Sequence, residues 1–190
     1  MSAAPLLRLD KIACIRGGRL LFEGIDLVLA PGGAAILTGP NGIGKSSLMR
    51  IAAGLLRPAA GAVERGGSIA LADESPALDE RLTLRKALGF WAGLDGAKAC
   101  LEPLGLGRLA DVPVRMLSAG QRKRAMLARV AASGAPLWLL DEPANGLDAE
   151  GQERLAALMA AHRSRGGAVL AASHQPLGLE GAAELRLERP

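Results

Sequence analysis

The chain of 190 residues is 49% hydrophobic and 22% charged, carries a formal net charge of +4, and has only 2% aromatic residues with no tyrosine. This length suits one domain, and the hydrophobic share excludes a disordered chain. The mildly basic balance fits an anionic ligand, an acidic membrane surface or nucleic acid, and equally an ordinary solvated surface of mixed charge. Composition therefore indicates a globular protein with a core of Leu, Ala, Val and Ile, and it leaves the partner open.

Cysteine spacing, the first ten residues and the lengths of the apolar runs argue against several further classes. Cys14 and Cys100 lie far apart and form no CxxC pair, so zinc sites and disulfide frameworks are not expected and a reducing compartment is the simpler interpretation. The first ten residues lack a basic region followed by an apolar stretch, so we expect no signal peptide. Apolar runs stay below the roughly 18 residues that a membrane-spanning helix needs. The chain is therefore not expected to cross a membrane itself.

The first part of the chain predicts short strands separated by turns. Strand patterns occupy residues 7–15, 25–30, 34–39 and 68–72, and glycine-rich turns lie at 17–18 and 31–33. The third of these runs is short and apolar, which is typical of a buried strand. It leads directly into a glycine-rich stretch followed by a helical pattern.

The rest of the chain alternates helical and strand patterns. Residues 82–132 are mostly helical, and 136–140 form an apolar run ended by an acidic pair, as in a buried parallel strand. Residues 148–166 predict an amphipathic helix with acids early and bases late, and 168–173 and 183–187 predict strands. This alternation favours an α/β fold with a mainly parallel sheet and helices on both faces.

Residues 39–46, "GPNGIGKS", match the phosphate-binding pattern G-x-x-x-x-G-K-[ST] between a predicted strand and a predicted helix. The glycines let the backbone curl so that its N–H groups point at the β- and γ-phosphates. Lys45 adds a mobile charge, and the Ser46 hydroxyl is placed to bind Mg²⁺. The alternative is a chance glycine-rich turn. The predicted ATP-binding residues of this loop are Gly39, Pro40, Asn41, Gly42, Ile43, Gly44, Lys45, Ser46 and Ser47.

The acidic pair that follows 136–140, Asp141 and Glu142, is expected to act together with the phosphate loop. Asp141 would lie at the carboxyl end of a buried strand, where ligands bind in open α/β sheets. There it can hold Mg²⁺ through water, and Glu142 can polarise the attacking water. The alternative is that "DEP" simply ends a strand and caps a turn.

The two histidines receive different interpretations. His174 follows the predicted strand 168–173, on the same sheet edge as Lys45 and Asp141, where an imidazole can hydrogen-bond a γ-phosphate or the attacking water. The alternative is that it is a surface or satisfied core residue, which is how we interpret His162.

The segment "LSAGQ" at 117–121 begins a predicted helix with Ser118 as its N-cap. The basic run 122–124 in its first turns opposes the helix dipole. Together with the phosphate loop, the acidic pair, "NGLD" at 145–148 and "SHQ" at 173–175, this segment resembles the ATPase subunits of ABC transporters, whose signature is usually written LSGGQ.

This resemblance implies a P-loop NTPase fold of the ABC ATPase type, with an N-terminal antiparallel β part and an inserted helical lobe. We therefore expect one domain over 1–190, with a core of 1–81 and 133–190 and a lobe at about 82–132. Two copies would pack head to tail, with ATP between the phosphate loop of one and the signature of the other. The implied roles are Lys45, Glu142 and His174 in catalysis, Ser46 and Asp141 at Mg²⁺, Asp148 in communication across the dimer, and Ser118, Ala119, Gly120 and Gln121 as the signature that meets the partner's γ-phosphate.

Further stretches, such as "PLWLLDEPANGLDAEG" and "GGAVLAASHQPLGL", resemble the cytochrome c biogenesis ATP-binding export proteins, also called haem exporter ATPases. This subfamily implies peripheral attachment to the cytoplasmic face of the bacterial inner membrane. The implied partners are a second copy of the chain and integral membrane subunits of the cytochrome c maturation system, with no nucleic acid. Alternatives are an ATPase of another transporter, a soluble ABC ATPase, and a regulatory module that binds ATP without turning it over.

The sequence departs from the family pattern at two places. The aromatic residue expected to stack on adenine is replaced by Arg16, whose guanidinium plane can stack on a base or can belong to a solvent-exposed turn. The Gln expected between the phosphate loop and the signature is missing from 72–80. Asp73, Glu74 or Ser75 could offer an oxygen ligand there, although a carboxylate would also repel the γ-phosphate.

Overall fold

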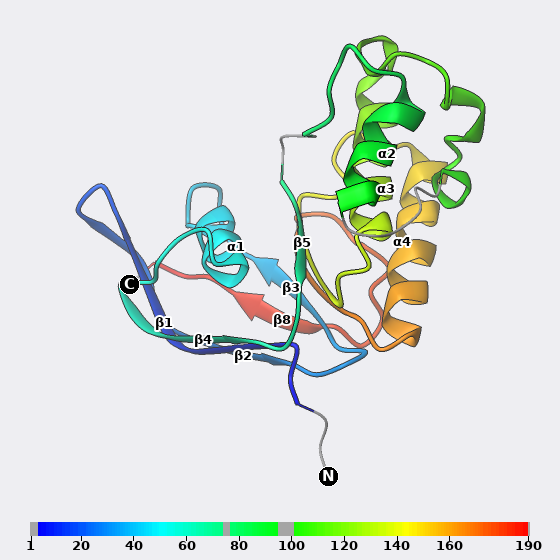
Figure 1. Ribbon diagram of the computed structural model, residues 1–190. Coiled ribbons are helices and arrows are strands. Elements are labelled where there is room, and N and C mark those ends of the chain that lie inside the picture. The colour runs from blue at the N-terminus through cyan, green and yellow to red at the C-terminus, as the bar shows by residue number, and fades with distance from the viewer. Residues whose placement is uncertain (1–3, 74–76, 95–100, 190) are drawn as a thin grey trace.

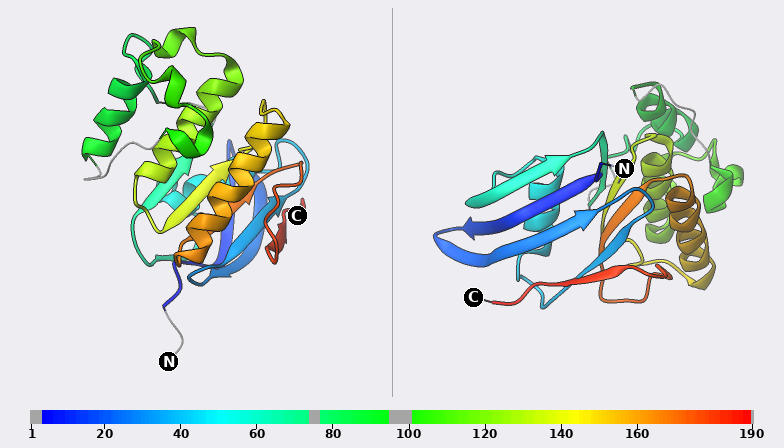
Figure 2. Two further views of the ribbon diagram at one scale, coloured as in Figure 1. Left: turned by 90° about the vertical axis from the view of Figure 1, so that its right-hand side faces the viewer. Right: turned by 90° about the horizontal axis from the view of Figure 1, so that it is seen from below.

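The computed structural model describes residues 4–73, 77–94 and 101–189. It contains two sheets with helix α1 (Lys45–Ala53) between them, and further helices on the far face of the larger sheet (Figures 1 and 2). The remaining helices are α2 (Leu84–Leu94), α3 (Ala119–Ala132) and α4 (Ala149–Ser164), with short 3₁₀ turns at Glu102–Leu104, Gly107–Leu109 and Val114–Met116.

The larger sheet has five strands in the order β5-β6-β7-β3-β8, and every neighbouring pair is parallel. These strands are β3 (Ala34–Thr38), β5 (Ile69–Ala72), β6 (Leu137–Asp141), β7 (Ala168–Ala172) and β8 (Ala183–Arg186). Because all strands run the same way, their carboxyl ends meet at one edge, and the segments that follow β3, β6 and β7 can converge there.

The second sheet is antiparallel, in the order β2-β1-β4. Its strands are β1 (Leu7–Arg16), β2 (Arg19–Leu29) and β4 (Ala60–Arg65). Its apolar face packs on α1 through side chains such as Ile12 and Phe22, which are at most 1% exposed. Helix α1 is thereby held between the two sheets.

The core divides into two clusters because side chains alternate along the buried strands. In β6, Leu137 and Leu139 face α1 and the antiparallel sheet, whereas Trp138 and Leu140 face α2, α3 and α4. All five residues of β6 are buried. This explains why the strand is a continuous apolar run that ends abruptly at Asp141.

The predicted fold class is confirmed: the structure is α/β, with a parallel sheet, an N-terminal antiparallel sheet, and α2, α3 and the 3₁₀ turns grouped together beyond the face of the parallel sheet that α4 also covers (Figure 1). The strand predicted at 25–30 overlaps β2, which begins earlier, at Arg19, and ends at Leu29. Strand β4 is an additional strand for which the sequence gives no clear pattern, since most of its residues are exposed. Among the described residues, no helix has the length and apolar character that a bilayer span requires.

Candidate active site

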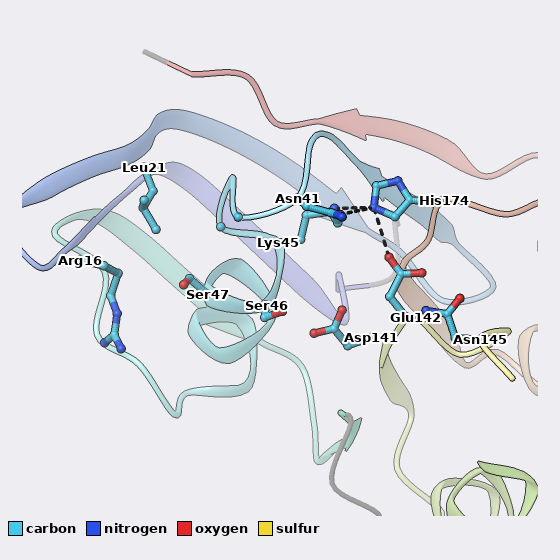
Figure 3. A pocket seen from close by; sticks show the side chains of 12 residues that line it. Arg16, Leu21, Asn41, Lys45, Ser46, Ser47, Asp141, Glu142, Asn145 and His174 are labelled. Carbon is cyan, nitrogen blue, oxygen red and sulfur yellow. Dashed lines mark hydrogen bonds and ion pairs between the residues drawn. The ribbon is translucent and has the colours of Figure 1, made fainter. Parts of the chain in front are cut away.

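A cleft of about 570 Å³ lies beside the phosphate loop, at the carboxyl ends of the parallel strands (Figure 3). It combines residues from the antiparallel sheet, α1, the end of β6 and the segment after β7. The residues that line it are Arg16, Leu21, Asn41, Gly42, Gly44, Lys45, Ser46, Ser47, Asp141, Glu142, Asn145 and His174. The sequence predicted ten of these twelve, and the fold brings them together.

The phosphate loop depends on glycines for two separable reasons. Gly44 has a left-handed φ of 115°, and a Cβ there would lie 2.8 Å from the Phe22 ring of β2. Gly39 has a φ of 137°, and its Cβ would lie 2.7 Å from the Leu187 carbonyl oxygen. Left-handed backbone disfavours side chains, and here neighbouring atoms also leave no space. The loop therefore packs tightly between β2 and the segment after β8.

Lys45 begins α1 and is buried, with 8% of its surface exposed. Its Nζ donates to the carbonyl oxygen of Gly39 at 2.8 Å and to that of Pro40 at 3.4 Å, and it lies 2.9 Å from His174 Nε2. An ammonium group has only donors, and the two carbonyl oxygens accept from it. Phosphate oxygens that entered the loop would replace some of these contacts.

His174 is the meeting point of the polar groups in the cleft (Figure 3). Its Nε2 lies 3.0 Å from Asn41 Oδ1 and 3.5 Å from Glu142 Oε1, in addition to Lys45 Nζ. A cation, an imidazole, an amide and a carboxylate therefore converge within hydrogen-bond range or just beyond it. Such a cluster can position a phosphate oxygen and a water molecule next to one another.

The acidic pair is presented by the end of β6. Asp141 is the last residue of the strand and is only 8% exposed. Glu142 follows with a φ of 45°, a left-handed conformation that is uncommon for a residue with a side chain. Its N–H donates to the Ala172 carbonyl oxygen at 2.9 Å. This turn takes Glu142 out of the strand direction and places its carboxylate near His174.

The far side of the cleft is formed by the antiparallel sheet. Arg16, at the end of β1, is exposed and lines the cleft with Leu21 of β2. Beneath them, burial raises the pKa of the Cys14 thiol, while the charge of Arg16 and a hydrogen bond with the Ser47 side chain partly offset this rise. Arg16 thus lies on the cleft, as predicted, and its stacking role stays a prediction.

The signature residues do not line this cleft. Ser118 is the N-cap of α3: its Oγ accepts from the Gln121 N–H at 3.2 Å, and its own N–H donates to Gln121 Oε1 at 2.9 Å. This is a complete capping box. In the basic run that follows, Arg124 donates to the Leu104 carbonyl oxygen at 3.4 Å, so this cation contacts the chain itself.

Asp148 also lies outside the cleft. It caps α4, where its Oδ1 accepts from the Gly151 N–H at 2.8 Å. Its exposed position leaves the side chain accessible at the surface of the molecule. The predicted site residues therefore fall into two sets, one in the cleft and one at the starts of α3 and α4.

Sequence reasoning missed two cleft residues. Asn145 is the first residue of the quoted "NGLD" segment, so a signal was available for it, and Gln175 Nε2 lies 3.5 Å from its Oδ1. Leu21 gave no signal because an apolar residue in a strand is ordinarily a core residue. Of the candidates for the missing Gln, Asp73 does not line the cleft, whereas Glu74 and Ser75 fall outside the described residues.

His162 is a core residue, as interpreted from the sequence. It is 8% exposed, stacks on Trp138 with ring centroids 3.7 Å apart, and its Nε2 lies 3.2 Å from the Pro136 carbonyl oxygen. Burial lowers its pKa below the ordinary value of 6.5. The neutral ring is therefore part of the packing between β6 and α4.

In the described part of the chain, His, Cys, Asp and Glu side chains form no cluster of three or more that could hold a metal ion. The cleft does offer oxygen donors: Ser46 and Asp141 both line it. A hydroxyl and a carboxylate suit Mg²⁺, which usually takes one or two protein ligands and completes its shell with phosphate oxygens and water. The donor set therefore fits Mg²⁺ bound together with a nucleotide.

Comparison with known proteins places this cleft in a family. A family model described as "ABC transporter" matches residues 22–145. The protein of Sphingopyxis alaskensis named "Cytochrome c biogenesis ATP-binding export protein CcmA" is 57% identical over 185 residues, which cover 95% of each chain. The chain belongs to the CcmA family of ABC transporter ATP-binding proteins. Membership in this ABC family makes the chain an ATP-binding subunit with ATPase activity, as the motifs predicted.

Two further comparisons support this membership. A CcmA protein of Novosphingobium aromaticivorans is 62% identical over 169 residues, which cover 89% of this chain and 88% of the relative. A solved structure described as "Structure of ATP binding subunit of ABC transporter" superimposes with a TM-score of 0.86 at 24% identity, covering 96% of this chain and 86% of the other. The structural likeness confirms the ABC ATPase fold.

Proposed function

We propose that this CcmA-family chain hydrolyses ATP between two copies of itself, and that its turnover serves a membrane complex of cytochrome c biogenesis. The observation that carries the proposal is the separation of the predicted site into two sets. The cleft holds Lys45, Glu142 and His174, whereas the capped start of α3 at Ser118 lies outside it. Each copy would then contribute the cleft of one ATP site and the signature of the other.

Within the cleft, the chain's own groups divide the work of hydrolysis. The backbone of the phosphate loop and Lys45 bind and orient the β- and γ-phosphates. Glu142 accepts a proton from the attacking water. His174, whose Nε2 lies 3.5 Å from Glu142 Oε1, positions the γ-phosphate and the water relative to one another. Arg16 and Leu21 cover the base from the antiparallel sheet.

Ser46 and Asp141 would hold Mg²⁺, which when bound neutralises charge on the β- and γ-phosphates. Ser46 would bind through its hydroxyl, and Asp141 through an intervening water. The buried position of Asp141 at the end of β6 fixes its carboxylate relative to α1.

The start of α3 would supply further hydrogen-bond donors for the γ-phosphate, on the side of the cleft that is open in a single copy. The first N–H groups of a helix and its dipole favour an anion, and Ser118 and Gly120 are small enough to approach a γ-phosphate closely. In the capping box, Ser118 Oγ serves as an acceptor, so its hydroxyl proton is available to donate to a phosphate oxygen. A second copy packed head to tail would bring this helix end onto the cleft.

A Glu142→Gln variant tests the sandwich directly. It removes the group that activates water and leaves the phosphate contacts in place, so it should trap ATP and form a stable dimer that light scattering detects only with ATP. Wild-type protein with ADP is the matched control. If the variant stays monomeric with saturating ATP, the chain instead fits the alternative of a module that binds nucleotide without this mechanism.

The membrane assignment rests on the relatives' name, "Cytochrome c biogenesis ATP-binding export protein". We propose a peripheral position on the cytoplasmic face of the bacterial inner membrane, on integral subunits of the cytochrome c maturation system. The alternatives are an ATPase of another transporter and a soluble ABC ATPase. Purification from native membranes, followed by identification of the co-purifying subunits, decides among the three.

A further inference from the structure

We infer that Gly120 is a positioning residue that acts inside its own chain, by leaving room for the backbone of the loop between Glu142 and Asp148. This inference rests on the proposed function, because it concerns the loop that carries the proposed water-activating carboxylate. The family resemblance assigned Gly120 only to the partner's ATP. The structure gives it a contact within the same subunit.

The contact is between the start of α3 and the carbonyl of Gly146. A Cβ built on Gly120 would lie 2.9 Å from the Gly146 oxygen, closer than real Cβ atoms approach other atoms. The neighbour is backbone, so no rotamer change of a side chain can relieve the clash. Adding a methyl group at Gly120 must move α3, the 142–148 loop, or both.

The backbone conformation of Gly120 does not itself demand glycine. The residue lies within α3 and has no left-handed φ. Alanine is preferred over glycine in a helix by about 1 kcal/mol, so local propensity favours a side chain here. The adjacent Ala119 is exposed and carries one. Packing therefore explains the order Ala-Gly in "LSAGQ": position 119 has room for a methyl group, whereas the Gly146 carbonyl excludes one at position 120.

The loop that Gly120 contacts is anchored at both ends. At one end, the Glu142 N–H donates to the Ala172 carbonyl oxygen at 2.9 Å. At the other, the Asp148 carboxylate accepts from the Gly151 N–H at 2.8 Å. Because both ends of the loop are fixed, a shift of the Gly146 backbone must also displace neighbouring residues of the loop.

The interior of the loop is a series of tight turns. The Asn145 N–H donates to the Glu142 carbonyl oxygen at 3.3 Å, and the Leu147 N–H donates to that of Ala144 at 3.1 Å. Ala144 and Leu147 are buried, and Glu142 and Gly146 both have left-handed φ angles. A push on Gly146 is thus transmitted toward Glu142, whose carboxylate must stay near His174 to activate water.

Mixed dimers separate action within the chain from action on the partner. In a pair of Lys45→Ala and Ser118→Ala subunits, purified through two different tags, one ATP site contains both lesions and the other contains neither, and neither substitution adds bulk that would keep the two subunits apart. This reference pair should hydrolyse ATP at its intact site. In a pair of Lys45→Ala and Gly120→Ala subunits, the corresponding site has an intact cleft and an intact partner signature, but its Glu142 loop belongs to the Gly120→Ala chain.

We expect the Gly120→Ala pair to hydrolyse ATP at least about tenfold more slowly than the reference pair, since misplacement of a catalytic group by about 1 Å can cost up to about 100-fold. Equal rates in the two pairs would overturn the inference, because Gly120 would then act only on the partner. An inactive reference pair would count against the proposed ATP sandwich.

A second measurement tests the inference without reference to the sandwich. Hydrogen exchange of the amides at 144–148 is compared between Gly120→Ala and Gly89→Ala, both as nucleotide-free monomers. Gly89 lies in α2, and a Cβ there would meet no atom within 4 Å, so it is a matched glycine-to-alanine change in a helix. Faster exchange of the loop in Gly120→Ala alone supports the inference, and unchanged exchange in both variants overturns it.

Discussion

Lys45 and Glu142 both lie close to His174, but they are held in place by different parts of the fold. Lys45 and Glu142 both reach His174, at 2.9 Å and 3.5 Å. Lys45 is held by the phosphate loop itself, whereas Glu142 depends on a left-handed turn after β6. We therefore expect Lys45 to govern nucleotide binding and Glu142 to govern the chemical step.

This division predicts a graded response to substitution. Lys45→Ala should weaken ATP binding and abolish turnover, because the phosphates lose their buried cation. Glu142→Gln should keep ATP affinity within about threefold and lower kcat by about 100-fold or more, as expected when a general base is lost. Titration with labelled ATP and steady-state hydrolysis measure the two effects. Equal loss of affinity in both variants would contradict the assignment.

His162 makes a separate prediction about stability and pH. Burial lowers its pKa below 6.5, so on acidification the unfolded chain takes up a proton at this residue before the folded chain does. The contribution of His162 to the free energy of unfolding should therefore fall as pH drops below 6.5, and should be constant above that value.

His162→Phe keeps a ring against Trp138 and removes the titration. Urea unfolding of wild type and variant, compared over the range from about pH 7.5 to about pH 5.5, should show a flatter dependence for the variant. The same slope in both proteins would mean that another group carries the pH dependence.

Helix α1 has distinct polar partners at its two ends. Its first turn borders the cleft, and its last turn faces Arg65 at the end of β4. The Arg65 Nε donates to the Ala52 carbonyl oxygen and its Nη2 to that of Ile51, both at 2.7 Å. A cation that donates to carbonyls at the carboxyl end of a helix complements the dipole and satisfies groups that the helix leaves unpaired.

Arg65→Met should therefore lower the free energy of unfolding by about 1–2 kcal/mol, since hydrogen bonds to charged groups contribute more than neutral ones. Arg8→Met is the matched control: Arg8 is an exposed arginine on the neighbouring β1, paired in register with Glu64, and should change stability by no more than about 0.5 kcal/mol. Chemical unfolding followed by circular dichroism measures both. Equal losses in the two variants would remove the special role of Arg65.

Elements with local signals could be predicted from the sequence, and elements that depend on distant partners could not. The phosphate loop and the end of β6 were predictable because glycines, a lysine and an acidic pair mark them within a few residues. Strand β4 was not, because "AGAVER" is mostly exposed and becomes a strand through its pairing with β1. The family resemblance assigned Gly120 to the partner's ATP. Its contact with Gly146 could not be predicted, because it joins segments that only the folded chain brings together.

The whole molecule presents its predicted site residues on separate surfaces. The cleft combines the antiparallel sheet with the carboxyl edge of the parallel sheet, and the residues at the start of α3 do not line it. In the proposed sandwich, one copy would bind ATP through the cleft alone, and the signature would contribute only when a second copy arrives. This arrangement makes binding and hydrolysis separable in solution.

Ser118→Arg exploits this separation. The bulky cation at the start of α3 should block the approach of the partner's cleft, so hydrolysis should be lost, whereas the affinity of the monomer for ATP should stay within about twofold because Ser118 does not line its own cleft. The substitution also removes the N-cap of α3, which costs about 1 kcal/mol, and Ser118→Ala controls for that loss without adding bulk. Nucleotide titration and hydrolysis are measured on both variants. Full turnover by Ser118→Arg would mean that the signature does not meet ATP across a dimer, and the shared site would have to be abandoned.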